Sequence, residues 1–335
     1  MAKLIVIIGI TGIQGSSVAN VFLKETGWKI RGITRDPSKP ESKALAGKGI
    51  EILKGDVNDF ESIKIAVRGA SVVFGNTVFP EAFVNPSAEN ISKLAPGPTL
   101  LERCYETELQ QGKNVADAVA TVDDLELFVW SSLSHAKKWS GGKYTSVYHF
   151  DSKAHVVDYI NMVHPNVAKK MSVLQLGFYV TNWKLGEGAS IPLKRRPDGS
   201  IILRVPGNGD MPVPFIVPED TGYFVKALTQ VPAGKNLIAF GDRLTWDDYI
   251  RLWSNITGIP AVFERTTVSE HAKLAPWGFG KEIAEMLAYA QEFGYDGSDP
   301  TIVSAQQLEV DVPVTRIEQY IRNEDWSSIA SENTT

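Results

Sequence analysis

Short apolar runs alternate with helical stretches along the first half of the chain. The apolar runs are rich in β-branched residues and cover residues 3–8, 28–35, 49–56, 70–77, 125–132 and 171–176. Helical periodicity lies between them at 16–26, from about 59, at 105–121 and at 151–163. Continuously apolar runs are typical of parallel strands that helices cover on both faces. The pattern predicts an α/β Rossmann fold, a doubly wound parallel sheet with right-handed crossovers.

The regular alternation ends near residue 176. Residues 177–218 are dense in glycine and proline and include short strands such as 201–203, and helices are predicted at 245–257 and 279–293. We therefore expect a Rossmann domain over 1–176 and a smaller C-terminal α+β domain over 177–326. Some segments of the smaller domain are expected to return to the Rossmann sheet. The polar residues 327–335 are expected to form a frayed tail.

Residues 78–103 interrupt the alternation with a proline-punctuated insertion. Connections of this length in compact domains are usually functional or disordered. The sequence leaves two interpretations open, a lid over the site and a mobile surface excursion.

Three glycines at a spacing of three follow the first apolar run. Gly9 allows a tight turn, Gly12 allows the backbone to approach a diphosphate, and Gly15 allows the new helix to pack closely on the strand. The free N–H groups at such a helix N-terminus attract an anion. We expect this loop, including Thr11 and Gln14, to bind the diphosphate of a dinucleotide.

The end of the second strand indicates which nicotinamide nucleotide is bound. An NAD enzyme places an acidic residue there for the ribose, whereas an NADP enzyme places an arginine for the 2′-phosphate. The sequence offers Arg35, which favours NADP(H), although Arg35 and Asp36 also fit a solvated turn. At the end of the third strand, Asp56 fits two roles, acceptor for the adenine amino group and cap of the next helix.

Composition narrows the class of partner. Hydrophobic residues make up 43% of the 335 residues and the net charge is −5, which argues against binding to nucleic acid or an anionic membrane. We see neither a membrane span nor a signal peptide and expect a cytoplasmic protein. The lone Cys104 excludes an internal disulfide. No metal site is expected, since four of the histidines show no ligand spacing: His135, His155, His164 and His271.

Candidate catalytic residues follow the fifth strand, where ligands bind in this architecture. Ser132 ends that strand, and His149 and Lys153 lie four residues apart on one face of the next helix. Short-chain dehydrogenases use a Tyr-x-x-x-Lys pair of this spacing to deliver a proton and hold the nicotinamide ribose.

Several motifs together resemble the NmrA-like family of atypical short-chain dehydrogenases. They are GITGIQG at 9–15, QGKNVADA at 111–118, WSSLS at 130–134, HFDSK at 149–153, FYVTNW at 178–183 and VPEDTG at 217–222. The resemblance covers roughly residues 4–258. It implies a Rossmann domain that binds NADP(H) and a small domain closing over a substrate cleft. The family holds both cofactor-sensing regulators and working reductases, many from fungal biosynthetic pathways.

The chain departs from the dehydrogenase pattern at His149, which stands where the tyrosine is found. Reduction of a ketone leaves an alkoxide that needs a proton. Histidine can supply it near neutral pH, but His149 also fits a plain helix start, and Tyr144 and Tyr148 are nearby substitutes. Hydride addition to an iminium carbon gives a neutral amine directly, so a site without the tyrosine suits C=N better than C=O.

We therefore expect an NADPH-dependent reductase of a hydrophobic, alkaloid-like small molecule in natural-product biosynthesis. Phe178, Tyr179 and Trp183 are the candidate substrate contacts, followed by Trp277 and Phe279, although each also fits a core position. Such a pocket would also steer a following cyclisation by fixing the conformation of the product. The alternative is a non-catalytic NADP(H) sensor that docks on a regulatory protein partner.

Overall fold

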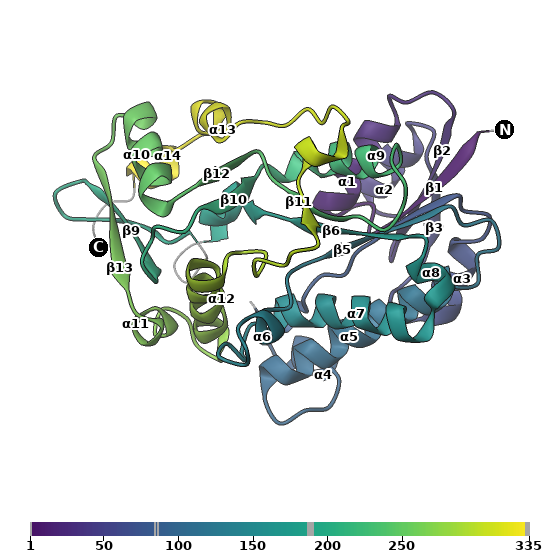
Figure 1. Cartoon of the computed structure of the whole chain (residues 1–335), viewed down its shortest axis with the longest axis horizontal. Helices are drawn as coiled ribbons and strands as arrows, with labels where there is room; N and C mark the ends of the chain where they lie inside the picture. The colour runs from purple at the N-terminus through teal and green to yellow at the C-terminus, as the bar shows by residue number, and fades with distance from the viewer. Residues whose placement is uncertain (1, 84, 86, 186–190, 332–335) are drawn as a thin grey trace.

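The computed structural model describes every residue except 1, 84, 86, 186–190 and 332–335. Its centre is a sheet of eight parallel strands in the order β14-β11-β6-β5-β4-β1-β2-β3 (Figure 1). The strands are β1 (Lys3–Ile8), β2 (Trp28–Thr34), β3 (Glu51–Lys54), β4 (Val72–Gly75), β5 (Leu127–Ser132), β6 (Met171–Leu176), β11 (Asn236–Ala239) and β14 (Ile302–Val303). The predicted doubly wound α/β fold is confirmed.

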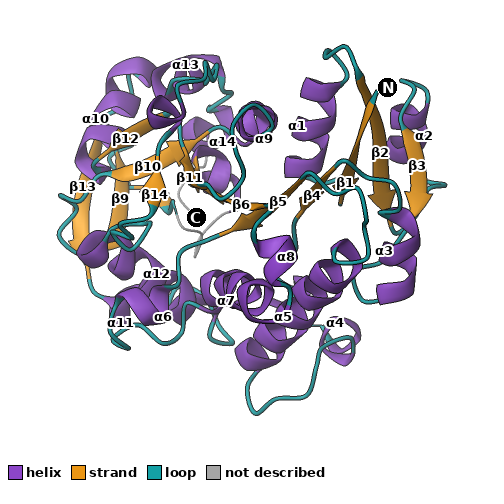
Figure 2. Cartoon of the chain, turned by 45° about the vertical axis from the view of Figure 1, so that its right-hand side comes forward, coloured by secondary structure: helices purple, strands orange, loops and turns teal. Residues whose placement is uncertain are grey.

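Helices cover both faces of this sheet, which explains the continuously apolar strands. In β1, Ile5 and Ile7 pack into the core under α1 and α9, whereas Val6 and Ile8 pack into the core of the opposite face. Figure 2 shows α1 and α9 on one side of the sheet and α3, α5 and α7 on the other. Apart from α4, which belongs to the insertion described below, the helices of the first half of the chain are α1 (Ile13–Phe22), α2 (Pro40–Ala46), α3 (Phe60–Ala66), α5 (Leu100–Val119), α6 (Ala136–Trp139), α7 (Tyr148–Val163) and α8 (Pro165–Ala168). Helix α9 (Thr221–Leu228) joins them from the second half.

The second half of the chain builds two small sheets around an aromatic core. One sheet is β12-β10-β7 and the other is β13-β9-β8. The strands are β7 (Phe178–Tyr179), β8 (Leu193–Arg195), β9 (Ile201–Pro206), β10 (Val213–Ile216), β12 (Asp242–Leu244) and β13 (Ala261–Thr266). The helices are α10 (Trp246–Thr257), α11 (Val268–Ala272), α12 (Phe279–Phe293), α13 (Ile317–Asn323) and α14 (Ser327–Ser331), with 3-10 turns η2 (Val180–Leu185), η3 (Pro218–Asp220) and η4 (Ala305–Leu308).

The two halves share structural elements. Strands β11 and β14 come from the second half of the chain, yet they extend the large sheet beyond β6. Helix α9 also packs on α1, where the amide of Gly222 donates to the hydroxyl of Ser17 at 2.9 Å. A Cβ at Gly222 would lie 2.5 Å from the carbonyl oxygen of Ser17, so only glycine permits this approach.

Three helices begin three or more residues before their predicted starts. Helix α1 begins three residues early because Gly12 serves as its N-cap, and α7 begins at Tyr148. Helix α5 begins five residues early because Thr99 caps it by accepting from the amide of Glu102 at 3.2 Å. The insertion therefore carries regular structure, namely η1 (Glu81–Phe83), α4 (Ala88–Ser92) and the first turn of α5, while residues 84 and 86 lie outside the described chain.

The polar tail is not frayed throughout its described part. Residues Ser327–Ser331 form α14, and Ile329 is buried in the core of the second half. The prediction was wrong here because one apolar side chain anchors an otherwise polar segment. Residues 332–335 lie outside the described chain. Among the described helices, none is both long and apolar enough to span a bilayer.

Candidate functional site

The glycine loop joins β1 to α1 in a conformation that side chains would obstruct. Gly9 has a positive φ of 68°, and a Cβ there would lie 3.0 Å from Oδ1 of Asn76. A Cβ at Gly15 would lie 2.3 Å from the carbonyl oxygen of Gly9, so α1 approaches the loop as closely as its backbone permits. The amide of Gly12 donates to the same carbonyl at 2.9 Å and closes the turn.

The N-terminus of α1 offers free amide groups. No side chain in the described chain caps the helix at Gly12, and its first turn carries no acidic residue. Thr11 and Gly12 are exposed beside it. Uncapped N–H groups with the positive end of the helix dipole form an anion site, so a diphosphate fits here.

Two orphaned polar atoms lie at the carboxyl edge of the sheet. Oε1 of Gln14 and the hydroxyl of Thr77 are buried, and neither has a hydrogen-bond partner among the described residues. The Gln14 amide nitrogen donates to the Tyr179 hydroxyl at 2.9 Å. Buried polar atoms normally have partners, so each of these two has an unused hydrogen-bond position that no described residue fills.

At the end of β2, Arg35 and Asp36 have different environments. Arg35 is exposed, and no described residue provides its guanidinium with an ion pair or hydrogen bond. The carboxylate of Asp36, by contrast, is already hydrogen-bonded. Ser38 donates to its Oδ1 from the backbone amide at 2.9 Å and from the hydroxyl at 2.6 Å. These hydrogen bonds hold the pKa of Asp36 below its usual range. The free group at this edge is thus a cation, as a 2′-phosphate requires.

The structure contradicts one of the two roles considered for Asp56. Helix α3 is capped by Asp59, which accepts from the amides of Glu61 and Ser62. Oδ1 of Asp56 accepts from the amide and the side-chain nitrogen of Asn58, each at 2.9 Å. Asp56 therefore shapes the loop after β3, and its role as an acceptor for adenine stays a prediction.

Lys153 lies on α7 and pairs with a buried acid of α5. Its ammonium donates to Oε1 of Glu108, and the hydroxyl of Ser152 donates to Oε2 of the same carboxylate. Glu108 has no exposed surface, and the side chain of Lys153 is 10% exposed. The ammonium also lies 3.5 Å from the carbonyl oxygen of His149. Glu108 therefore fixes the position of Lys153, which must use another of its N–H groups to hold a ribose.

His149 is paired in the same way, with Glu282 of α12. Nδ1 of His149 lies 2.7 Å from Oε1 of Glu282, and the His149 amide donates to that oxygen at 2.8 Å. Glu282 is fully buried, and its Oε2 has no partner in the described chain. The carboxylate therefore orients the imidazole and favours the tautomer with the proton on Nδ1. Nε2 remains for contact with a ligand.

Aromatic residues surround His149. The ring centroids of Phe79 and Phe83, both from the insertion, lie 6.1 and 6.3 Å from its ring, and Phe279 of α12 lies 4.5 Å from Phe83. All three phenylalanines are half-buried. The insertion thus brings apolar surface to the candidate catalytic helix.

Of the two substitute proton donors near His149, one is engaged by a carboxylate. The Tyr144 hydroxyl donates to Oε2 of Glu292 at 2.9 Å, and burial together with this bond raises the pKa of Tyr144. The ring of Tyr148 packs edge-on against Tyr105 at 5.8 Å, and burial raises the pKa of Tyr148 as well. Both phenols are therefore weaker acids than a free tyrosine.

The aromatic residues predicted to contact substrate have structural partners. Phe178 packs in the aromatic core beside Phe215 and Trp246, and Trp183 stacks on Trp326. Tyr179 differs, since its hydroxyl reaches the nucleotide loop through Gln14. Of the further candidates, Trp277 is 69% exposed, whereas Phe279 joins the rings around His149. Part of the same region, residues 186–190, lies outside the described chain.

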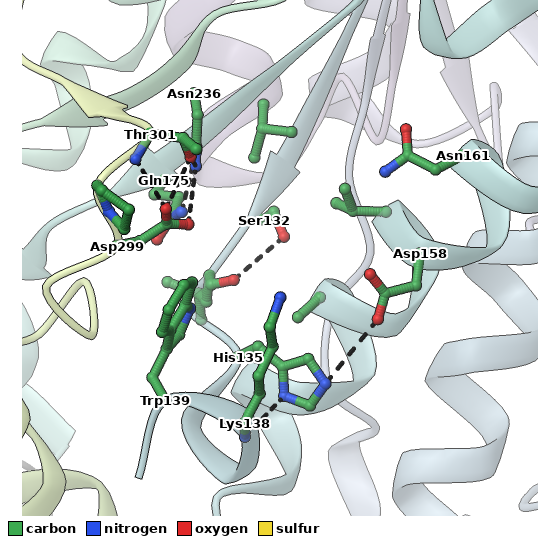
Figure 3. Close-up of a pocket in the computed structure, with 15 residues that line it drawn as sticks. Ser132, His135, Lys138, Trp139, Asp158, Asn161, Gln175, Asn236, Asp299 and Thr301 are labelled. Atoms are coloured by element: carbon green, nitrogen blue, oxygen red, sulfur yellow. Dashed lines mark hydrogen bonds and ion pairs between the residues drawn. The ribbon is translucent and has the colours of Figure 1, made fainter. Parts of the chain in front are cut away.

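Ser132 lines a cavity of about 290 Å³, and its hydroxyl donates to the carbonyl of Leu133 at 3.3 Å. Figure 3 shows this cavity with Gln175, Asn236 and Asp299 on one side and Asp158 on the other. Ala154 and Val157 of α7 line it, but His149 and Lys153 are not among its lining residues. A shared catalytic role of Ser132 with His149 and Lys153 stays a prediction.

The expectation that the histidines form no metal site stays a prediction, but the fold brings two of them together. The ring centroids of His135 and His155 lie 4.4 Å apart, and a carboxylate oxygen of Asp158 lies within 4.8 Å of a nitrogen of each ring. His135 is the N-cap of α6, and the other two residues lie on α7. A spacing of three between His155 and Asp158 could have indicated a shared helix face. The approach of His135 depends on the turn after β5, which local periodicity does not reveal.

Sequence reasoning also missed the acidic partners. Glu108 lies in the buried row of α5 formed by Cys104, Glu108, Gly112 and Val115. A charged residue within an apolar helical stripe signals a buried partner. Glu282 gives no comparable signal because α12 is buried almost all round.

Comparison with known proteins places this geometry in context. The sequence model of the NmrA-like family matches residues 1–324. An NmrA-like family domain-containing oxidoreductase from Aspergillus hancockii is 28% identical over 271 residues, which is 78% of this chain and 75% of the relative. A second such oxidoreductase, from Aspergillus campestris, is 25% identical over 89% of this chain and 86% of its own length.

Solved structures show the same fold at low identity. NmrA, described as a negative transcriptional regulator, superposes with a TM-score of 0.71 at 17% identity and covers 96% of this chain and 95% of its own. NmrA in complex with NADP gives a TM-score of 0.69. Leucoanthocyanidin reductase with NADPH, from Vitis vinifera, superposes with a TM-score of 0.67 at 15% identity and covers 95% of this chain and 98% of its own.

Proposed function

This chain belongs to the NmrA-like family, and from that premise we propose that it is an NADPH-dependent reductase of a hydrophobic small molecule. The observation that carries the proposal is that, among the described residues, no side chain caps α1 and none pairs with Arg35 at the neighbouring strand end. The first fits a diphosphate, and the second fits the 2′-phosphate that distinguishes NADP(H) from NAD(H). Relatives named as oxidoreductases support the reaction class.

The chain's own residues would hold the nucleotide at three places. Gly9, Gly12 and Gly15 would admit the diphosphate to the α1 amides, and Arg35 would bind the 2′-phosphate. Lys153, held by Glu108, would bind the nicotinamide ribose. When bound, NADPH supplies the hydride.

We further propose that the substrate presents an iminium or imine carbon. A ketone requires a proton donor at the developing alkoxide, but the Tyr144 hydroxyl is bound to Glu292, and burial raises the pKa of Tyr148, which makes it a weaker acid. An iminium carbon accepts hydride and becomes a neutral amine without a proton. The rings of Phe79, Phe83 and Phe279 would stabilise such a cation through their π faces.

The same surroundings favour a bulky, alkaloid-like substrate in natural-product biosynthesis. Half-buried aromatic rings bind planar groups with large contact area. They would also restrict the conformations of the reduced product and so guide a following cyclisation.

The second candidate function is that of an NADP(H) sensor without turnover, which docks on a regulatory protein. It is supported by the similarity in fold to NmrA, described as a negative transcriptional regulator, and by the absence of the dehydrogenase tyrosine at His149. The insertion that brings Phe79 and Phe83 to His149 favours the enzyme, because a sensor has no use for apolar surface beside the nicotinamide site.

The two functions are separated by a binding measurement followed by a turnover measurement. Fluorescence titration of the full chain with NADPH and NADH tests the nucleotide preference. NADPH oxidation is then followed with cyclic imines, enones and ketones. The reductase proposal expects tight NADPH binding and oxidation with the imines above all.

Tight NADPH binding without oxidation by any of these substrates would support the sensor and reject the enzyme. Failure to bind either nucleotide would reject both functions. Faster turnover of ketones than of imines would contradict the assignment of the substrate alone, because NADPH-dependent reduction would still take place.

A further inference from the structure

We propose that His135, His155 and Asp158 bind one divalent transition-metal ion of the zinc type at the edge of the cavity beside α7. This site is independent of the proposed nucleotide site, and its ligands include none of the residues assigned to NADP(H). The three side chains come from the turn after β5 and from one face of α7.

The ligand atoms are close enough to share an ion. Those of the three residues all lie within 4.8 Å of one another, and Nε2 of His135 is 3.9 Å from Oδ2 of Asp158. Bonds of about 2.1 Å to a tetrahedral zinc ion place ligand atoms about 3.4 Å apart. Small side-chain rotations would close the remaining gap, since Asp158 is 60% exposed and free to move.

Both imidazoles have a polar partner at Nδ1. Nδ1 of His135 lies 3.1 Å from Oδ1 of Asp151 and 3.3 Å from the amide of Lys138, and Nδ1 of His155 lies 3.0 Å from the Tyr105 hydroxyl. Histidines that ligate metals typically engage their other ring nitrogen with a carboxylate or another polar group, which fixes the ring and its tautomer. Metal binding through Nε2 of His135 therefore requires the tautomer that donates from Nδ1 to Asp151, and the hydrogen bond from the Lys138 amide is given up.

Two carboxylates, Asp151 and Asp158, face the two nitrogens of His135 and attract a cation. The cationic side chain of Lys138 lines the same cavity and opposes part of that attraction. Imidazole nitrogen with one carboxylate oxygen is a donor set that zinc accepts readily. A cation between the ligands would offset the anionic charge that Asp151, which is almost fully buried, brings to this region.

Three protein ligands leave one coordination position open. His135 and Asp158 line the cavity of about 290 Å³, so that position faces the cavity (Figure 3). An open position that faces a cavity with polar lining suits bound water or a small polar ligand.

Calorimetry with zinc chloride tests the proposal on the full chain after dialysis against EDTA. We expect one zinc ion per chain, and a visible absorption band when cobalt(II) replaces zinc. His155→Gln should weaken zinc binding about 100-fold or more, and Asp158→Asn about tenfold or more. Tyr105→Phe, which removes only the hydroxyl beside His155, should weaken it about tenfold.

His164→Gln is the matched control. His164 is a half-buried histidine that bonds Asp117 at 2.7 Å, outside the cluster, and its replacement should leave zinc affinity unchanged. Asp158→Asn changes an exposed side chain, so it keeps the test valid if His155→Gln fails to fold. Wild-type protein that takes up no stoichiometric zinc overturns the proposal. So does full affinity in Asp158→Asn, or an equal loss in His164→Gln. None of these results bears on NADPH binding.

Discussion

Arg35 lies at the end of β2 without a partner in the described part of the chain, and we expect its removal to distinguish the two nicotinamide nucleotides. We expect Arg35→Ala to weaken NADPH binding about tenfold or more, because a charge-assisted bond to the 2′-phosphate is lost. NADH binding should change little. Nucleotide titration measures both constants, with Arg251→Ala on α10 as a control for loss of a distant guanidinium. Equal losses for NADPH and NADH would remove the phosphate assignment.

Lys153 has a second role that complicates its replacement. We expect Lys153→Ala to lower turnover sharply, but it also leaves the carboxylate of Glu108 buried without its cation. Removing one partner of a buried ion pair typically costs about 3–5 kcal/mol of stability. The loss of activity must therefore be separated from a loss of fold.

The double variant Lys153→Met with Glu108→Gln makes that separation. It leaves no uncompensated charge, so thermal stability should recover towards that of the wild type while turnover stays low. Recovery of turnover together with stability would show that Lys153 acts only in folding, and that the ribose contact has been misplaced.

At the residue scale, the sequence revealed positions but not partners. The lysine and histidine of α7 stand at a spacing that one helix face dictates, so Lys153 and His149 could be singled out. Their partners Glu108 and Glu282 lie 45 and 133 residues away, and only the packing of α5 and α12 against α7 brings them together. Phe79 was missed for the same reason, because its insertion carries no periodic pattern.

At the scale of elements, the turn from β1 to α1 depends on a glycine contact. We expect Gly15→Ala to destabilise the chain by about 1–3 kcal/mol and to abolish NADPH binding. Its Cβ would lie 2.3 Å from the carbonyl oxygen of Gly9, and backbone cannot move aside as a flexible side chain can.

Urea unfolding and NADPH titration measure the two effects of Gly15→Ala. Gly47→Ala at the end of α2 is the control, because Gly47 has an ordinary φ of −62° and a Cβ there would meet atoms no closer than 3.5 Å. That control should be neutral or slightly stabilising. Normal nucleotide binding by Gly15→Ala would contradict the loop assignment.

Helix α11 contains a histidine that makes stability depend on pH. Both ring nitrogens of His271 are buried without partners in the described chain, and burial lowers its pKa from 6.5 to about 4. Between these two values the unfolded chain binds a proton that the folded chain does not. Stability should therefore be highest above pH 6.5 and fall as the pH drops towards 4, by on the order of 3 kcal/mol from this group.

Unfolding in urea at several pH values, compared between wild type and His271→Leu, isolates that contribution. The variant has no group to protonate at this position, so its stability should fall less steeply between pH 6.5 and 4. Parallel curves for the two proteins would show that His271 is not the group responsible.

Elements with strong local signals were predicted closely, and those fixed by tertiary packing were not. Helix α12 matches its predicted bounds, and α10 begins directly after its capping residue Thr245, as the capping residues indicated. Ser327–Ser331 and the early start of α5 were missed, since one buried isoleucine and one threonine cap decide them.

At the scale of the whole molecule, the shared sheet predicts one cooperative unit. Strands β11 and β14 complete the large sheet from the second half, and α9 packs on α1. We expect calorimetry to show a single unfolding transition that NADPH moves to higher temperature as a whole. Two resolved transitions, with only the first responding to NADPH, would contradict this coupling.

The overall architecture followed from the apolar runs, because parallel strands buried on both faces have a distinct composition. The sequence could not show which later segments rejoin the sheet. Strand β11 has four residues and β14 has two, too few for a periodic signal. Their places are set by the edge of β6 and not by their own composition.

The hydrogen bond from Gln14 to Tyr179 links two segments that lie 165 residues apart in the sequence. It joins the glycine turn at the start of the chain to the first strand of the second half, so a replacement of Tyr179 would change the surroundings of that turn through a single side chain.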